Sequence, residues 1–584
     1  MSDTKLTVMI VGGYGTFGGR LSRLVAVEPG VRLLIAGRNI AKARAFCDTH
    51  LTGADAEPVV FDRDGDIIGA LGALDPDLVV DASGPFQDYP GDVYKLVRAC
   101  IGGGVNYIDL ADASAFVLGI GQFNDVAREH GCFALTGASS YPTLSAAVMR
   151  HLTEPMPRVE TITAGIAPSP HATLGKNVVI AGISYAGKPI ELVYRGQPVT
   201  GYALAETRRS TIAPPGVLPL KNRLFSLVDV PDNQLMLLQW HGLKAIWFGF
   251  SPGPDLPQRG FNIAANLVRF RLLPSLKLFA PIIARLASWL RWGEDRSGMF
   301  VAIAGRGEDG TRTERTWHLI AEDDHGPFIP AMAVAAVVRR CLAGRIPEPG
   351  ARPAIDDVDL ADYEALFERF SMRWGVRDEG PSTAQQPLYR RLLGSAWDDL
   401  PAPIRGMHDL DGTMVAEGRA RVTRGTGFLA RLAGRVIGFP DAGDDMPVKV
   451  TFAGEDGQET WRRDFAGQTF ESVQSQGRGR SAYLVNERFG AITVGLGLAV
   501  ADGRLRIVVR RWSLFGIAMP MMLAPRSDAY ESVEEGRFNF HVDVSLPLAG
   551  HIAGYHGWLE PRPLTTAEEA EIARGKTAFA QATS

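Results

Sequence analysis

Three glycines follow the first apolar run of the chain at a spacing that suits a bound pyrophosphate. Gly13, Gly15 and Gly18 stand between the run 6–11 and a helical pattern that begins near Arg20. A strand-to-helix turn of this kind offers bare backbone amides and a helix N-terminus to a dinucleotide. Gly13 allows the tight turn, Gly15 admits the pyrophosphate, and Gly18 lets the helix pack closely on the strand. A glycine-rich turn without a ligand is the alternative. The cofactor contacts predicted here are Gly12, Gly13, Tyr14, Gly15, Thr16, Phe17 and Gly18.

The end of the second predicted strand indicates which dinucleotide fits. NAD-specific folds place an acidic residue there to hold the ribose hydroxyls, whereas this chain has Arg38 after Gly37 and no acid beside it. An arginine suits a 2′-phosphate, so we predict NADP as the cofactor, with a solvated surface arginine as the alternative. Asp62 closes the third predicted strand and is a candidate for the adenine amine, although a turn role fits an aspartate there equally well.

The fourth predicted strand ends in small residues at the edge where the nicotinamide half would lie. Ser83, Gly84 and Pro85 are predicted to give the cofactor access there, and a turn needed only for its geometry is the alternative. Residues 107–109 on the next strand and 139–142 after the sixth can face the same crevice. None of these groups forms a recognisable acid/base pair, so the catalytic residues stay unassigned.

Histidines and cysteines give little support for a metal site. His551 and His556 are five positions apart, and no third ligand is placed by the sequence, so we predict a structural role and no metal. The four cysteines are scattered without a CxxC pair, which argues against a disulfide framework and favours a reducing cytoplasm. The absence of a Gly-x-Ser-x-Gly elbow argues against hydrolysis.

The length of 584 residues is too great for one hydrophobic core and indicates about three or four domains. Because 61 basic and 65 acidic side chains give a net charge of −4, we expect no nucleic-acid partner. Residues 1–5 lead into the first strand without the basic and apolar regions of a secretory signal, so we expect a cytoplasmic protein. The sequence does not set the oligomeric state.

The longest apolar stretch, residues 261–292, contains five basic residues, no acidic residue and two prolines. Such a segment is not an uninterrupted spanning helix. One interpretation is a set of helices packed on the second domain with their arginines facing water. The other is a basic, tryptophan-bearing interfacial helix, which predicts peripheral contact with a lipid surface.

The first 145 residues alternate apolar runs with helical patterns, which is typical of a Rossmann-type α/β domain with a doubly wound parallel sheet. Its predicted strands are 6–11, 32–36, 57–61, 78–81, 107–110 and 132–136. Period-two segments from about residue 158 indicate a second, mixed or antiparallel α+β domain. Long strand-like runs after a polar linker at 376–386 indicate a C-terminal antiparallel α+β domain. We predict domains at 1–145, 146–328 and 386–565, with helices between 329 and 375 packing back on the first.

Several motifs together resemble the saccharopine dehydrogenase-like NADP-binding family. They are the glycine-rich turn, Ala36-Gly37-Arg38, the stretch 79–86, and 99–100 leading into 106–110. The resemblance implies a Rossmann domain, a second domain that carries the substrate, and nicotinamide-dependent redox chemistry. Members of the family include amino-acid dehydrogenases and reductases thought to act on lipid-like substrates. The chain has no convincing counterpart of the substrate-binding residues of true saccharopine dehydrogenases, so we do not expect a role in lysine metabolism.

The C-terminal part is similar to the uncharacterised DUF4166 domain through residues 510–517 and 555–559. That resemblance implies no function. The sequence as a whole favours a cytoplasmic NADP-dependent oxidoreductase that acts on an unidentified organic, lipid-like small molecule. The alternative is a non-catalytic NADP(H)-sensing protein whose C-terminal module binds an apolar ligand.

Overall fold

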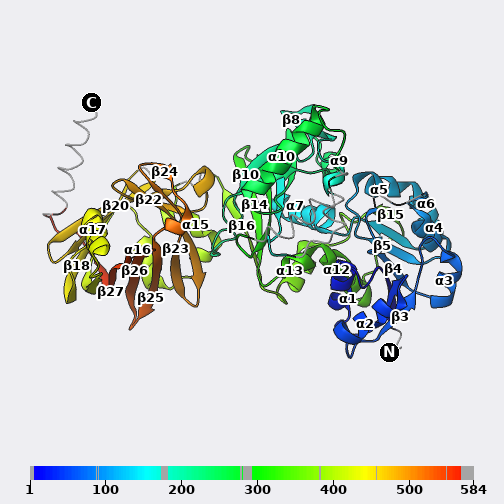
Figure 1. The fold of residues 1–584 in the computed structure, drawn as a ribbon, viewed down its shortest axis with the longest axis horizontal. Helices are drawn as coiled ribbons and strands as arrows, with labels where there is room; N and C mark the ends of the chain where they lie inside the picture. Colours follow the sequence, from blue (N-terminus) through cyan, green and yellow to red (C-terminus); the bar gives the residue numbers. More distant parts are fainter. Residues whose placement is uncertain are drawn as a thin grey trace. The chain divides into compact units, whose positions relative to one another are not determined.

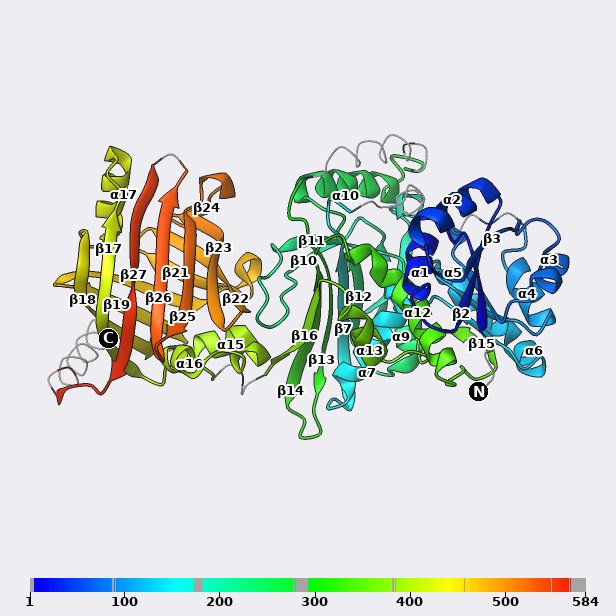
Figure 2. The ribbon, with the colours of Figure 1, turned by 90° about the horizontal axis from the view of Figure 1, so that it is seen from below.

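The computed structural model describes residues 5–86, 89, 91–172, 182–276, 279, 292–380, 383, 385–455, 457–547, 549–566 and 568. The chain forms two compact units, whose elements are labelled in Figure 1 and seen from a second side in Figure 2. Unit 1 comprises Met1–Arg209 and Arg223–Trp374, and unit 2 comprises Ser210–Asn222 and Gly375–Ser584.

The N-terminal domain of unit 1 contains a parallel sheet with the strand order β3-β2-β1-β4-β5-β6-β15. The order reverses between β1 and β4, which is the topological switch point at which doubly wound sheets bind nucleotides. The last four residues of β1 are buried, as expected for a strand with helices on both faces. The strands are β1 (Leu6–Val11), β2 (Val31–Gly37), β3 (Ala56–Val60), β4 (Leu78–Asp81), β5 (Asn106–Asp109), β6 (Phe133–Thr136) and β15 (Gly350–Pro353).

Helices from two distant parts of the chain accompany this sheet. The connecting helices are α1 (Gly18–Val25), α2 (Ile40–His50), α3 (Ile67–Leu74), α4 (Lys95–Gly102), α5 (Ser114–Gly119) and α6 (Asn124–Glu129). Much later, α12 (Ile329–Leu342) packs beside α1, as Figure 1 shows, and β15 pairs with β6 at the sheet edge. Helix α13 (Leu360–Phe367) packs against α12. The N-terminal domain is therefore completed by a segment that follows the second domain.

The second domain is built on a mixed sheet with the order β10-β11-β12-β7-β13-β14-β16, with β8 and β9 paired beside β12. Strands β12 and β7 are parallel, whereas β7 and β13 are antiparallel. The elements are α7 (Ser145–Thr153), β7 (Arg158–Ala167), β8 (Pro189–Tyr194), β9 (Gln197–Tyr202), β10 (Thr207–Ser210), β11 (Arg223–Leu227), α9 (Asp232–Gln239), β12 (Ala245–Phe250), α10 (Asp255–Arg269), β13 (Ser297–Arg306), β14 (Arg312–Ala321) and β16 (Met372–Glu379).

The C-terminal domain is an antiparallel sheet that closes into a barrel, because β22 and β23, distant along the pairing order, also pair with each other. Figure 2 shows β17, β27, β26, β25 and β23 side by side in one wall, with α15 and α16 at one end. The elements are α15 (Leu388–Leu393), α16 (Ala402–His408), β17 (Thr413–Arg424), α17 (Phe428–Ile437), β18 (Gly443–Glu455), β19 (Gln458–Phe465), β20 (Gln468–Gln476), β21 (Val485–Phe489), β22 (Ile492–Ala501), β23 (Arg504–Leu514), β24 (Ile517–Ala518), β25 (Arg526–Glu534), β26 (Arg537–Leu546) and β27 (Gly550–Arg562).

The α/β fold class with its three kinds of domain is confirmed, and the predicted strands of the first domain agree with β1–β6 to within one residue at each end. The strand-like runs 446–452, 460–465, 491–500, 505–512 and 537–545 predict β18, β19, β22, β23 and β26, whereas β17, β20, β21, β24, β25 and β27 have no predicted counterpart. In β20 the inward positions include the buried polar residues Ser472 and Gln474, so the strand lacks an apolar alternation. The predicted linker 376–386 is wrong in its first part, because β16 runs on to Glu379 as a strand of the second sheet.

The basic apolar stretch is only partly within the described residues. Helix α10 covers its first part, and Arg269 at the end of that helix lies over the Tyr202 ring at 4.1 Å. Residues 277, 278 and 280–291, which carry most of the remaining basic residues, lie outside the described residues. Lipid contact through this segment therefore stays a prediction. No described helix combines the length and the apolar character needed to cross a bilayer.

A buried arginine joins the segment Ser210–Asn222 to the rest of unit 2. The Arg377 guanidinium donates hydrogen bonds to the carbonyl oxygens of Ala213 at 2.6 Å and Leu392 at 2.7 Å. It also lies 4.9 Å from the ring of Tyr483. One side chain thereby holds the segment Ser210–Asn222 against α15.

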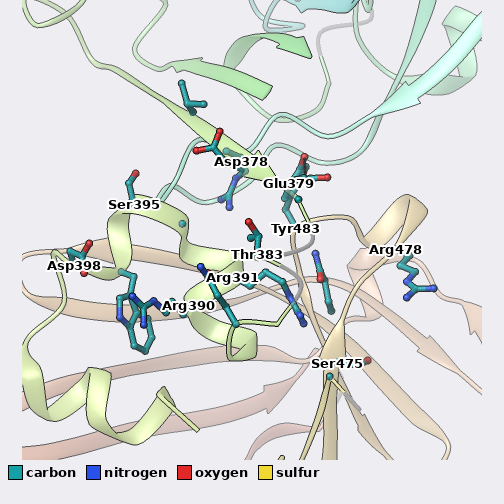
Figure 3. A pocket seen from close by; sticks show the side chains of 18 of the residues that line it. Asp378, Glu379, Thr383, Arg390, Arg391, Ser395, Asp398, Ser475, Arg478 and Tyr483 are labelled. Carbon is teal, nitrogen blue, oxygen red and sulfur yellow. Dashed lines mark hydrogen bonds between the residues drawn. The ribbon is translucent and has the colours of Figure 1, made fainter. Parts of the chain in front are cut away.

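The same arginine lines a polar cavity of about 950 Å³ in unit 2. Figure 3 shows Arg390 and Ser395 from the α15 region and Tyr483 from the barrel around this cavity. Arg390 is exposed, in contrast to Arg377.

We expect Arg377→Met to lower the stability of unit 2 by about 1–3 kcal/mol, because methionine leaves buried carbonyl oxygens without donors. Urea unfolding of the full chain measures the change. Arg390→Met is the matched control on the same cavity and should change stability by less than about 0.5 kcal/mol. Equal effects of the two substitutions would show that the buried hydrogen bonds do not stabilise this unit.

Candidate functional site

The turn between β1 and α1 can be formed only with glycine at three of its positions. Gly12 has a φ of +77°, which favours glycine. A Cβ on Gly13 would come within 2.9 Å of the Ile10 carbonyl oxygen, and a Cβ on Gly18 would overlap the carbonyl oxygen of Gly12. The helix N-terminus is therefore held directly against the strand end, as predicted for Gly18.

This tight turn leaves backbone amides available to a ligand. Gly15 and Thr16 are exposed, and the N–H groups of Tyr14, Thr16 and Phe17 have no hydrogen-bond acceptor within the described part of the chain. Unpaired amides at a helix N-terminus form an anion-binding site. The predicted turn residues therefore fit the pyrophosphate of a dinucleotide.

Tyr14 connects this turn to the end of β2. A Cβ on Gly37 would lie 2.6 Å from the Tyr14 ring, so the ring covers a glycine that has no room for a side chain. The Tyr14 hydroxyl accepts a hydrogen bond from the Asn39 amide at 3.2 Å. Arg38 stands between these two contacts and is exposed at the carboxyl end of β2, next to the glycine-rich turn. Tyr14 thus positions the segment that carries Arg38.

Three aspartates close strands of the parallel sheet in the same way. Asp62 after β3, Asp81 in β4 and Asp109 in β5 each accept a hydrogen bond from the backbone amide two residues further on, at 3.1, 3.0 and 2.9 Å. This is the side-chain turn that aspartates commonly form at strand ends. The geometry of Asp62 therefore favours the turn role over the adenine contact, which stays a prediction.

A polar cluster that the sequence did not indicate lies beside Ser83. The buried Asp81 carboxylate accepts a hydrogen bond from the Ser83 hydroxyl at 2.6 Å and pairs with Arg63 at 3.4 Å. Arg63 also lies over the ring of Tyr89 at 3.3 Å. Burial, together with the Asp81 charge, raises the pKa of Tyr89, so its hydroxyl keeps its proton. Arg63 follows β3 directly, and a search of all strand ends for basic residues would have found it.

Ser83, Gly84 and Pro85 are partly exposed after β4, close to the turn, since a Cβ on Gly12 would approach the Ala82 carbonyl oxygen to 3.0 Å. The structure thus brings the predicted turn, the end of β2 and the start of this loop together at the switch point. Whether each predicted residue contacts a cofactor stays a prediction.

The other predicted crevice residues are buried, except the half-buried Ser139. Tyr107 and Asp109 are both 0% exposed, and Tyr141 packs edge-on against Phe248 of the second domain at 5.3 Å. The Asp109 Oδ1 atom accepts hydrogen bonds from the hydroxyl of Thr136 and the amides of Ala111 and Gly137. Burial raises the pKa of Asp109 to about 7. These residues hold the strand ends and the domain contact in place.

The histidines form a different pair from the one the sequence indicated. His556 on β27 faces His541 on β26, with the two Nδ1 atoms 2.6 Å apart, and Asp543 lies 3.3 Å from the His541 Nε2 atom. Burial and the neighbouring His541 lower the pKa of His556. His551 contacts Thr423 instead. Two imidazoles and a carboxylate are types that bind divalent metals, so a purely structural role stays a prediction.

Two family models match parts of the chain. Residues 8–137 match the Saccharopine dehydrogenase NADP binding domain, and residues 400–559 match the Domain of unknown function (DUF4166). No curated protein matches the chain. The N-terminal domain therefore has the fold of NAD(P)-binding domains of the dehydrogenase type.

Several solved structures are similar to parts of the chain. Saccharopine dehydrogenase (L-Glu forming) from Saccharomyces cerevisiae is 14% identical, with 64% of this chain and all (100%) of that chain covered at a TM-score of 0.47. A meso-dapdh mutant from Clostridium tetani is 12% identical, with 62% and 99% covered at a TM-score of 0.32. GenD2 from gentamicin A biosynthesis, in complex with NAD, is 13% identical, with 53% and 72% covered at a TM-score of 0.27.

We expect Asp109→Asn to remove a pH dependence of stability. In the wild type the native state keeps the Asp109 proton up to about pH 7, whereas the unfolded chain releases it near its ordinary value, so stability falls as pH rises between these values. Asparagine can accept the same three hydrogen bonds and does not ionise. The stability of the variant relative to wild type should therefore rise on the order of 2–4 kcal/mol between pH 4 and pH 8.

Urea unfolding across this pH range measures the difference. The exposed Asp62→Asn is the matched control and should run parallel to wild type. A constant difference between Asp109→Asn and wild type at every pH would show that the Asp109 carboxyl titrates normally.

Proposed function

We propose that this protein is an NADP-dependent oxidoreductase acting on an organic, lipid-like substrate. The observation that carries the proposal is the set of unpaired amides at Tyr14, Thr16 and Phe17 together with the exposed Arg38 beside them at the switch point of the sheet. An anion site at a helix N-terminus and a guanidinium one strand away match the two phosphate-bearing parts of NADP.

Each part of the chain has a separate task in this proposal. The amides of the turn bind the pyrophosphate, and Arg38 pairs with the 2′-phosphate through its planar fork. Asp81 holds Ser83 through two hydrogen bonds, which orients the loop along which the nicotinamide half would lie. A bound nicotinamide supplies hydride exchange, whereas the protein supplies orientation and electrostatics.

The second domain supports the substrate side of the proposal. Ser114 of the first domain donates a hydrogen bond to Asp229 at 2.9 Å, and the buried Asp232 accepts one from Ser145. The Ser114–Asp229 hydrogen bond links the second domain to α5 of the first, and the Ser145–Asp232 hydrogen bond lies within the second domain. A substrate bound between the two domains would be held next to the cofactor edge.

Substrate-dependent consumption of NADPH, followed by its absorbance, tests the enzymatic proposal. The panel should contain amino acids, oxo acids, and long-chain ketones, aldehydes and alkenes, and we expect turnover with the long-chain compounds. Gly15→Val is the negative control, because a Cβ there already lies 3.0 Å from the Gly12 carbonyl oxygen and its methyl groups would fill the pyrophosphate space. NADPH binding without turnover of any compound would favour the sensing protein.

The choice of cofactor gives a sharper prediction. Hydrogen bonds to charged groups are worth roughly 1.5–3 kcal/mol, so Arg38→Ala should weaken NADPH binding by about 10- to 150-fold and leave NADH binding nearly unchanged. Calorimetric titration of both cofactors measures this. Arg44→Ala, which removes an exposed arginine of the following helix, is the matched control and should alter neither affinity. A wild type that prefers NADH, or equal weakening of both cofactors, would refute the assignment to NADP.

A further inference from the structure

The barrel of unit 2 encloses a cavity that the oxidoreductase proposal does not use. The cavity measures about 190 Å³. Apolar side chains from several strands form most of its wall, including Val450, Phe452, Val494, Leu496 and Phe538. Because the sheet closes on itself through β22 and β23, the cavity lies inside a continuous hydrogen-bonded wall. Small closed barrels of this kind hold one small ligand.

The helices at one end of the barrel add polar groups to this apolar wall. Tyr389 comes from α15, and His408 is the last residue of α16. The Tyr389 hydroxyl donates a hydrogen bond to Gln474 at 3.0 Å, and its ring stacks on the His408 ring at 3.8 Å. The ring of Trp461 stacks on the rings of Tyr389 at 6.0 Å and His408 at 5.7 Å. Gln474 completes the group. All four side chains line the cavity.

One atom of this group has no partner. His408 is 1% exposed, and its Nε2 atom lies 2.7 Å from the Glu531 carboxylate. Because a carboxylate accepts hydrogen bonds, a neutral His408 ring would carry its proton on Nε2 and present Nδ1 as an acceptor. No described residue donates a hydrogen bond to Nδ1. A buried acceptor without a donor is costly, so a donor in the cavity would stabilise the barrel.

The charged groups on the wall limit the charge of an occupant. Arg463 pairs with Glu487 at 3.2 Å, and Ser472 and Gln474 also donate to the same Glu487 oxygen. This pair is neutral as a whole. With the His408 ring neutral, Glu531 leaves one net negative charge on the cavity wall, which disfavours an anionic occupant in so apolar a space.

We propose that the barrel of unit 2 binds a small neutral amphiphile whose hydroxyl group donates a hydrogen bond to the Nδ1 atom of His408. A water occupies roughly 10–15 Å³ in a comparable measure, so the cavity holds an apolar body on the order of a dozen non-hydrogen atoms. Long-chain alcohols and compact ring alcohols have this size and chemistry. The proposal is independent of the dinucleotide site, because all of its residues lie in unit 2.

Displacement of the neutral fluorescent probe N-phenyl-1-naphthylamine from the full-length protein tests the proposal. The competitors are 1-decanol, its isomer methyl nonyl ether, and decanoate. The ether has the same number of atoms but no donor, so 1-decanol should bind about 2- to 10-fold more tightly than the ether, as expected for one neutral hydrogen bond. Decanoate should bind more weakly than either. Tighter binding of decanoate or of the ether than of 1-decanol would refute the hydroxyl contact.

Cavity-filling variants locate the binding site. Val494→Phe places a ring in the cavity and should weaken 1-decanol binding at least 10-fold. Thr493→Phe is the matched control, because the adjacent residue of β22 points to the opposite face of the strand and does not line the cavity. Circular dichroism verifies that both variants are folded. Unchanged binding in a folded Val494→Phe protein, or no probe binding to the wild type, would overturn the proposal.

A paired substitution tests His408 itself without leaving a buried charge. His408→Phe combined with Glu531→Leu keeps an aromatic ring at position 408 and removes both partners of the His408–Glu531 hydrogen bond. In this variant 1-decanol and the ether should bind with equal affinity. A preference for 1-decanol that survives both substitutions would show that the hydroxyl contact lies elsewhere.

Discussion

The close contact between α1 and the turn after β1 is the constraint on which the first unit depends. A Cβ on Gly18 would overlap the Gly12 carbonyl oxygen, and the positive φ of Gly12 favours glycine at that position as well. Because the helix begins at this point, the amides of Tyr14, Thr16 and Phe17 lack acceptors among the described residues and are available to an anion. The same turn approaches Ala82 after β4 and, through Tyr14, covers Gly37 at the end of β2. One turn thereby sets the relative position of three strand ends.

The strand ends themselves are held by carboxylates. Asp81 and Asp109 stand directly opposite each other on β4 and β5, and both are fully buried. One oxygen of each accepts a hydrogen bond from the backbone that leaves its strand, and Asp81 is also paired with Arg63. Buried charges are tolerated only with such partners. Aspartates therefore hold the carboxyl edge of the sheet, where the exposed Gly15 and Arg38 also lie.

The stability of unit 2 depends on the closure of its sheet and on the ionisable groups buried inside it. Its antiparallel sheet has no open edge across the β22–β23 closure, and α15 and α16 bury their apolar faces against its interior. The interior nonetheless contains Arg463, Glu487 and the His408–Glu531 pair. Placing ionisable groups inside a barrel is unfavourable unless their hydrogen bonds are satisfied, and all but the Nδ1 atom of His408 are accounted for in this group. Such an exception at the wall of a cavity is the property expected of a binding site.

The sequence by itself determined the local features of this protein. The apolar run before Gly13, the glycine spacing and the helical pattern after it specify β1, the turn and α1, because strand and helix periodicity are short-range properties. The places of Arg38 and Ser83 at strand ends and the parallel α/β class follow from the sequence for the same reason. The tertiary structure alone decided that Asp62, Asp81 and Asp109 act on their own turns, that Arg63 and Tyr89 join Ser83, and that His556 meets His541. The closure of the barrel is likewise visible only in the tertiary structure. Its strands β27 and β20 lack a regular apolar alternation, because β27 is rich in glycine and β20 turns polar residues inward. These contacts join residues far apart in the chain, and side-chain pairing across strands depends on register and burial, which no local pattern encodes.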